Sequence, residues 1–460
     1  RGAKTILIDP VRHASKNLAD RYVTPRPGGD FDLAMAVARL LFDRGAVDAT
    51  APSWCDHFDE LKALVLRQSA EDWSRRADVP MTDVEAIAVA LADKPCSIQV
   101  GWGMQRRVNG SAIVRALDAL SALSGNIGIP GGGASFYFKR RGAFDTGFLA
   151  KNPPRTLAEP LLGEEILNAK EPPVRAVWVT AGNPVAMLPD SATVARALET
   201  RELVVVVDSF LTDTSSRATV VLPTTTLVED DDLMGAYGHH WLGVSTPAVP
   251  APAEVKGDLE IVQALAKVID VKTGANGDGI AHQIAGSARE WKKRILQRIE
   301  PMGVTLERLE EGAVKNPLAP KVLFADRKFP TGTGRMNLIH AFPEEPPEEA
   351  GFPLWLFSNS TEKAQSSQWA GADPDVTTAT CHPKAADGFS EGDVVFLESA
   401  IGRMRVRLKL DESQRPDLVI VPKGGHYDRG TSANALIRAR LTDAGEGAAY
   451  QDCRVRFRRA

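Results

Sequence analysis

Short apolar runs rich in β-branched residues recur along the chain, and stretches with helical spacing separate them. The runs cover residues 5–8, 97–100, 176–179 and 203–207. Continuous apolar runs of this kind are typical of parallel strands that are covered on both faces. The intervening stretches repeat apolar residues at helical spacing over residues 31–42, 84–91, 111–123, 192–198 and 259–268. Strands that alternate with such helices predict doubly wound α/β domains.

Two of these helices carry start signals. Asp30 directly precedes the first one and is the residue type expected at an N-cap. Thr82 and Glu85 have the spacing of a capping box at the start of the second. We therefore expect the first helix to begin after Asp30 and the second to begin after Thr82.

Three consecutive glycines at residues 131–133 mark a break, because neither a helix nor a central strand accepts them. We expect one α/β dinucleotide-binding lobe over residues 1–130 and a second over residues 131–270. Residues 271–350 predict a helical and loop-rich region, with a helix over 282–298 and an acidic, proline-rich linker over 343–349.

The last part of the chain has a different pattern, with short strands separated by turn signals. The strands are expected over residues 354–358, 394–398, 404–410, 418–421 and 453–457. Turn signals at residues 392–393 and 400–403 suit barrel corners. The predicted fold class is thus α/β, with two doubly wound parallel-sheet lobes followed by a C-terminal β-barrel-like domain over residues 351–460.

Composition narrows the function classes. The 460 residues include 43% hydrophobic residues and carry a formal charge of -4 with mixed signs, so no basic face for nucleic acid is expected. No apolar run approaches the roughly 18 to 20 residues that cross a bilayer. The four cysteines lie too far apart for a metal or cluster motif, and we expect buried thiols. Small-molecule chemistry is favoured.

The first residue is Arg1, and residues 4–9 already have the pattern of a buried strand. We expect the chain to start inside a fold, so that any targeting signal would lie upstream. A cytoplasmic location is expected, and a periplasmic one stays open.

In open α/β sheets, ligands bind beyond the carboxyl ends of the strands, so the residues that follow each run are informative. Glycines there allow a close approach of the backbone, and carboxylates accept hydrogen bonds from a ribose or from the two adjacent N–H donors of guanine. An aspartate in such a place is more often a turn former or an N-cap than a ligand-binding residue. Asp30 has two compatible roles, as the cap of the helix that follows it and as a ligand-binding residue. The collection favours a nucleotide. Its members are Asp9, Asp30, Gly101, Gly103, Gln105, Gly182, Asn183, Pro184 and Asp208.

The order of these motifs resembles that of the molybdopterin-guanine-dinucleotide oxidoreductases, which include dimethyl sulfoxide reductase, formate dehydrogenase and periplasmic nitrate reductase. Residues 8–10 with 26–30 resemble the guanosine-binding stretch of the family, and residues 101–110 with 125–128 resemble its next landmark. Residues 182–184, 207–208 and 212–214 resemble the second nucleotide lobe. The resemblance runs through nearly the whole chain and extends to the barrel that closes over the pterins. The resemblance adds seven candidate cofactor-binding residues: Thr212, Ser358, Asn359, Ser360, His382, Asn434 and Tyr450.

The resemblance implies a two-electron enzyme that transfers an oxygen atom or a hydride on a small substrate, formate-dehydrogenase-like or reductase-like. The implied cofactor is two copies of molybdopterin guanine dinucleotide with Mo or W. An electron-transfer subunit carrying iron-sulfur, flavin or cytochrome is the implied partner. Formate dehydrogenase relatives carry an arginine near the metal, which suggests Arg141 as a catalytic residue, although a solvated basic turn explains residues 139–142 equally well.

The family's cysteine-rich cluster segment and its protein ligand to the metal correspond to a region upstream of residue 1. An iron-sulfur cluster is therefore expected only in a missing N-terminal region or in a partner. The alternative of another class is a non-catalytic scaffold that keeps the fold without cofactor. A thiamine-diphosphate enzyme, prompted by residues 277–279, lacks the required later asparagine, since the next ones are Asn316 and Asn337.

Overall fold

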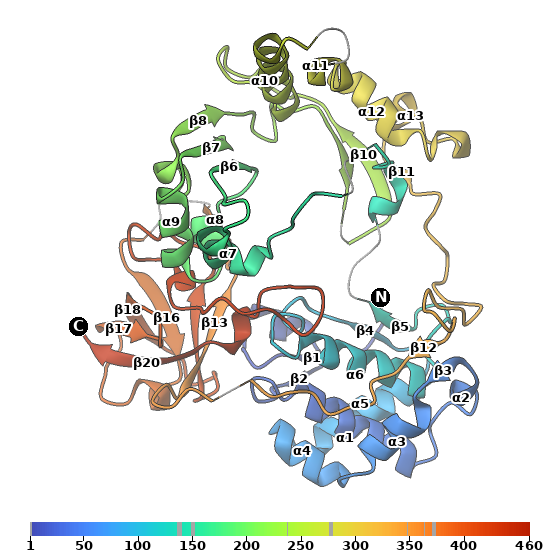
Figure 1. Ribbon diagram of the computed structural model, residues 1–460. Helices are drawn as coiled ribbons and strands as arrows, with labels where there is room; N and C mark the ends of the chain where they lie inside the picture. Colours follow the sequence, from blue (N-terminus) through green and yellow to red (C-terminus); the bar gives the residue numbers. More distant parts are fainter. Residues whose placement is uncertain are drawn as a thin grey trace.

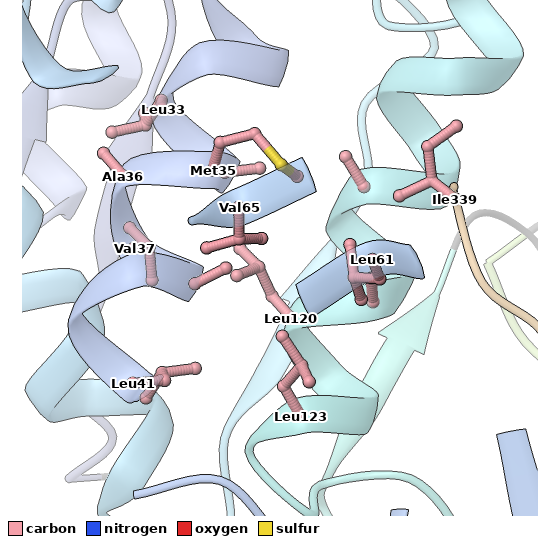
Figure 2. Packing of buried hydrophobic residues seen from close by; sticks show 14 of the residues in the cluster. Leu33, Met35, Ala36, Val37, Leu41, Leu61, Val65, Leu120, Leu123 and Ile339 are labelled. Atoms are coloured by element: carbon pink, nitrogen blue, oxygen red, sulfur yellow. The ribbon is translucent and has the colours of Figure 1, made fainter. Parts of the chain in front are cut away.

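The computed structural model describes residues 2–135, 140–148, 152–236, 238–275, 279–346, 348–362, 364–369 and 374–460. The first lobe surrounds helix α1 (Asp30–Asp43), whose side chains are buried on nearly all sides. Such a helix is expected at the centre of a core rather than on a surface. Figure 2 shows Met35, Val37 and Leu41 of α1 facing Val65 of α3 and Leu120 of α6. The helices around it are α2 (Ala51–Trp54), α3 (Phe58–Val65), α4 (Ala70–Ala77), α5 (Met81–Ala92) and α6 (Gly110–Leu123).

The strands of the first lobe form two parallel pairs. One joins β1 (Ile6–Ile8) to β2 (Arg21–Val23), and the other joins β4 (Ser97–Gln99) to β5 (Gly133–Ser135). The predicted N-cap role of Asp30 is wrong, since Gly29 occupies that position and no side chain caps α1. The predicted capping box is wrong as well. Helix α5 begins at Met81 after Pro80, so Thr82 and Glu85 already lie inside the helix.

The second lobe is built on a parallel sheet in the order β6 (Ala176–Thr180), β7 (Leu203–Asp208) and β8 (Val220–Pro223). Apolar residues of the sheet pack with helices α8 (Pro184–Met187) and α9 (Ser191–Glu199), and α7 (Leu162–Asn168) adds Leu162 to this cluster. Of the four predicted runs, only β7 has the expected continuous burial, because it is the middle strand of its sheet. Strand β6 lies at an edge and alternates between exposed and half-buried residues.

An antiparallel sheet of β9 (Asp232–Gly235), β10 (Trp241–Ser245) and β11 (Val314–Lys315) follows. It lies near α10 (Asp258–Thr273), α11 (Ile280–Gln283), α12 (Ala288–Leu296) and α13 (Leu306–Glu311), in the upper part of Figure 1. The single helix predicted over residues 282–298 is interrupted. Gly286 has a φ of +115°, and Ser287 then caps α12 through a capping box with Glu290.

The chain next returns to the first lobe, where β12 (Met336–Asn337) pairs in parallel with β3 (Cys55–Asp56) and Ile339 joins the core. The last domain is a closed barrel, seen in orange and red in Figure 1. Beside it lies a small hairpin of β14 (Ala364–Gln365) and β15 (Gln368–Trp369). The barrel order is β13 (Leu354–Asn359), β19 (Leu418–Pro422), β16 (Thr377–Cys381), β18 (Arg403–Leu410), β17 (Val394–Glu398) and β20 (Arg454–Arg459).

The predicted fold class is confirmed, with parallel α/β lobes followed by a barrel. Strand β16 was missed, because its sequence Thr-Thr-Ala-Thr-Cys lacks the large apolar residues that reveal the other strands. The prediction of buried thiols is confirmed for Cys55, Cys381 and Cys453, whereas Cys96 is half-buried. Among the described residues, no helix is long and apolar enough to cross a membrane.

Candidate functional site

The loop between β4 and α6 is where the first lobe meets the barrel. Asp443, from the last part of the chain, accepts hydrogen bonds from Ser111 N at 2.8 Å, Ser111 Oγ at 2.7 Å and Ala112 N at 3.2 Å. The backbone N–H of Gln451 donates to the Arg106 carbonyl at 2.9 Å. The N-terminus of α6 is therefore capped by a residue more than 300 positions away, and the loop before it is held against the barrel.

A buried ion pair lies at the centre of this contact. Arg107 Nη2 lies 2.7 Å from Asp452 Oδ1, and both side chains are almost wholly buried. Val108 N donates to the other oxygen of Asp452 at 2.5 Å. The Arg107 guanidinium also lies over the Trp355 ring, 4.9 Å from its centroid. Burial raises the pKa of Asp452, and the positive charge of Arg107 opposes that rise.

Asp30 is a second buried carboxyl group beside Arg107. It is 8% exposed, and no other described residue donates a hydrogen bond to it or forms an ion pair with it. Burial raises its pKa to about 6, with Arg107 as the main opposing charge. Gly28 has a φ of +82°, and a Cβ there would lie 2.8 Å from Arg107 Nη2. A side chain at residue 28 would therefore be strained by the positive φ and would displace the Arg107 guanidinium.

Asp9 follows β1 and acts on the same region. Its Oδ1 accepts a hydrogen bond from Val11 N at 2.8 Å, and its Oδ2 lies 3.7 Å from His13 Nε2. Burial raises the pKa of Asp9, and the charge of Asp9 contributes to the raised pKa of Asp30. The structure thus brings the two predicted carboxylates within electrostatic range of each other, with Arg107 as the main opposing charge for Asp30 and His13 beside Asp9.

The predicted loop residues lie at the surface of this region. A Cβ on Gly101 or Gly103 would meet no atom within 4 Å, so no neighbouring part of the chain requires a glycine there. Gln105 is exposed, and its backbone packs against Gly110, where a Cβ would lie 2.7 Å from the Gln105 carbonyl. The Gln105 side chain is therefore accessible to a ligand.

The predicted residues of the second lobe have local partners. Asn183 Oδ1 accepts from Thr214 Oγ1 at 2.7 Å, and Pro184 begins α8 directly after Asn183, which is the N-cap residue. Asp208 Oδ1 accepts from Phe210 N at 2.9 Å, which is the turn-forming role of an aspartate after a strand. Thr212 and Ser215 exchange hydrogen bonds through their hydroxyl and backbone groups.

Two barrel residues hold the end of α8. Asn434 Nδ2 donates to the Ala186 carbonyl at 2.7 Å, and the Tyr450 hydroxyl donates to the Met187 carbonyl at 2.8 Å. Burial raises the pKa of Tyr450 to about 12. The predicted motifs of the second lobe and of the barrel therefore meet at α8.

The remaining barrel residues occupy opposite rims. Ser358 and Asn359 end β13, with Ser360 following, and the Asn359 carbonyl accepts from Lys423 N at 2.7 Å. His382 follows β16, which runs antiparallel to β19, so the register places it at the other rim. Its Nδ1 accepts from Lys384 N and caps a short 3-10 helix. His382 is not brought together with the other candidates.

Arg141 belongs to a short 3-10 helix, Arg140–Ala143, but its side chain lies outside the described residues, as does Lys139. No individual role was predicted for Arg106, Arg107, Lys423 or Asp452, although three of them lie within motifs of the family resemblance. Burial, and then the positive charge of Arg106, lower the pKa of Lys423 to about 8. Lys423 precedes two glycines at a strand end, so the strand-end rule applied to β19 would have found it.

The contact between lobe and barrel has unsatisfied polar atoms. Asn109 Oδ1, Ser432 Oγ and Gln451 Oε1 are buried without a hydrogen-bond partner in the described part of the chain. Together with the Asp30 carboxyl group, they offer acceptors to a polar ligand that carries N–H or O–H donors. No group of three or more His, Cys, Asp or Glu residues suited to a metal ion is found among the described residues.

Known proteins are similar to this chain in sequence and in fold. Residues 1–268 match the family model of the molybdopterin oxidoreductases, and residues 357–454 match that of the molybdopterin dinucleotide binding domain. The probable oxidoreductase YyaE of Bacillus subtilis is 30% identical, over 100% of this chain and 72% of that protein. The assimilatory nitrate reductase catalytic subunit of the same organism is 24% identical, over 99% of this chain and 70% of that protein.

A solved structure with the same fold is acetylene hydratase from Pelobacter acetylenicus. Its TM-score is 0.76 at 20% identity, over 100% of this chain and 74% of that chain. That protein is named a hydratase, whereas the sequence relatives above are named oxidoreductases or reductases. The shared fold therefore does not identify a substrate.

Proposed function

The chain belongs to the molybdopterin oxidoreductase family, and from this membership we propose that it holds two molybdopterin guanine dinucleotides in an enzyme that transfers two electrons to or from a small substrate. One guanosine would be held by Asp9 and Asp30 in the first lobe. The other would be held in the second lobe near Asn183, Asp208 and Thr212. The molybdopterin dinucleotide binding domain would cover both from the barrel side.

The observation that carries this proposal is the Asp30 carboxyl group. It is more than nine-tenths buried, lies beside Arg107 and has no donor from another described residue. The two adjacent N–H groups of guanine are the donors that such a carboxylate lacks. The unsatisfied atoms of Asn109 and Gln451 at the same contact point to further polar groups of the ligand.

The bound cofactor would supply a metal, Mo or W, that exchanges two electrons with the substrate by oxygen-atom or hydride transfer. This chain's residues would orient it. Arg107 and Asp452 fix the barrel against the first lobe, and Asn434 and Tyr450 fix it against α8. Arg141 would orient an anionic or oxyanion substrate, as in a formate-dehydrogenase-like or reductase-like enzyme. A separate subunit would carry electrons to or from the site.

Metal and nucleotide content test the proposal. The native protein, purified with whatever accompanies it, is analysed for Mo and W by mass spectrometry and for GMP after acid hydrolysis. Two GMP per metal atom are expected. Asp30→Asn is expected to lower the GMP content, while Asp43→Asn, at the exposed far end of the same helix, is expected to leave it unchanged. A folded protein with neither metal nor GMP, from a host that makes the cofactor, would establish the scaffold alternative instead.

A further inference from the structure

A cavity lies in the first lobe, behind the strand that leads into the loop at residues 101–109. It has a volume of about 530 Å³ and is bounded by α6, by the glycine-rich loop at 127–134 and by the segment 321–337. Apolar side chains form most of its wall, among them Val114, Ile129, Phe324, Phe329 and Met336. Cavities of this size hold drug-sized molecules in other proteins.

The wall is formed by close contact between the loop and the segment. Gly128 has a φ of +73°, and a Cβ there would lie 2.3 Å from the Phe324 carbonyl oxygen. A Cβ on Gly132 would lie 2.3 Å from the Asn126 carbonyl oxygen. Side chains at these two positions would not fit, so the glycines allow the loop to pack directly on its neighbours.

The three charged side chains that line the cavity have different surroundings. Arg115 points its Nη2 at carbonyl oxygens, 2.8 Å from Leu338 O and 3.1 Å from Asn337 Oδ1, and Lys321 is exposed. Asp118 is the one carboxylate in the lining, and no described residue donates a hydrogen bond to it or forms an ion pair with it. Burial raises the pKa of Asp118 to about 6, Arg115 opposes that rise, and a cation placed beside the group would favour its ionised form further.

We propose that this cavity binds a small molecule in which a protonated amine is attached to an apolar body. The amine would pair with Asp118, and the apolar body would lie against Val114, Phe324 and Phe329. The Asp118 carboxylate would repel an anionic ligand, whereas a neutral apolar ligand would remove water from this half-buried charge without pairing with it. The inference stands on the cavity alone and does not depend on the proposed dinucleotide site.

Three probes of one shape and different charge test it: 4-phenylbutylamine, 4-phenylbutanol and 4-phenylbutyrate, measured by isothermal titration calorimetry at pH 7.5. The amine is expected to bind at least about ten-fold more tightly than the alcohol, and the carboxylate least tightly, because a hydrogen bond to a charged group is worth about 1.5–3 kcal/mol.

Asp118→Asn is expected to weaken amine binding by about ten-fold or more and to leave alcohol binding unchanged. Asp93→Asn, an exposed aspartate at the end of α5, is the matched control and should change neither. Val114→Trp, which fills the cavity, should abolish the binding of both probes. Equal affinity for amine and alcohol, no binding of the amine, or unchanged amine binding by the Asp118→Asn protein would each overturn the proposal.

Discussion

Asp30→Asn is expected to stabilise the cofactor-free chain at neutral pH while impairing nucleotide binding. Burial raises the pKa of Asp30 from 3.8 to about 6. One pH unit corresponds to about 1.4 kcal/mol, so the ionised carboxylate lowers the free energy of unfolding by about 3 kcal/mol above that pH. The pKa of Asp30 is higher in the folded state than in the unfolded state. The protonated group therefore favours folding at acidic pH, and this contribution to the free energy of unfolding is lost as the pH rises through 6.

The asparagine side chain has the same shape without the charge. The variant should therefore gain about 3 kcal/mol near pH 7.5 and roughly half as much near pH 5. Urea unfolding at the two pH values measures the gain, and hydrogen exchange of the α1 amides assigns it to the first lobe. Asp43→Asn is the matched control. Asp43 is exposed and paired with Arg39, so its removal should change the free energy by less than about 0.5 kcal/mol.

A variant no more stable than the parent near pH 7.5 would show that the Asp30 carboxylate is not destabilised by burial in the cofactor-free chain. An equal gain at both pH values would refute the electrostatic reasoning in another way, because a packing effect does not titrate. The expected combination, higher stability with lower GMP content, is typical of a binding residue whose partner is supplied by the ligand.

Two substitutions test the contacts around this site, and a labelling experiment tests the buried cysteines. Arg107→Met should lower the free energy of unfolding by about 3–5 kcal/mol, because it leaves Asp452 buried and without its ion-pair partner. Adding Asp452→Asn should recover part of that loss, as measured by urea unfolding. Equal losses in the single and double variants would rule out coupling between the two residues. Gly28→Ala should cost more than about 1 kcal/mol, since it combines a positive φ with a clash against Arg107, whereas Gly45→Ala meets no neighbour and measures the φ effect alone. Cys55 and Cys453, whose pKa values burial raises to about 12, should resist iodoacetamide at pH 8 in the native protein and react after unfolding, as read by mass spectrometry.

The fold was predictable where local pattern decides structure. Apolar spacing located α1, α6 and α9 to within one or two residues, because their buried faces repeat at helical spacing. Helix starts were less predictable. Polar residues near the start of α5 had the spacing of a capping box, but the chain entered the helix earlier, after a proline. Strand β16 contributes threonines and an alanine to the barrel, and a pattern search based on large apolar residues cannot find it.

The candidate site was predictable only in part, for a different reason. Asp30 came from the family resemblance. The strand-end rule found Asp9 and Asn183, because a parallel sheet places the residues that follow its strands at one edge. It could not find the pairing of Arg107 with Asp452, which joins positions more than 300 residues apart and depends on how the barrel packs on the first lobe. Arg107 lies within the motif at residues 101–110, but the motif does not show which residue it pairs with, so tertiary packing identifies the pair.

The predicted residues differ in the hydrogen-bond partners that their polar side-chain atoms already have. Asn434 and Tyr450 direct side-chain donors at carbonyl groups of α8, so their first role is to hold the lobes together. Asp208 is engaged in a turn. Asp30 differs from all of these, because its carboxyl group is buried and receives no donor from another described residue. Its own backbone N–H is the donor that the described residues supply, so the carboxyl group keeps acceptor capacity that a ligand with two adjacent N–H groups would satisfy. Among the predicted residues, Asp30 is therefore the one whose removal distinguishes a binding site from a structural contact.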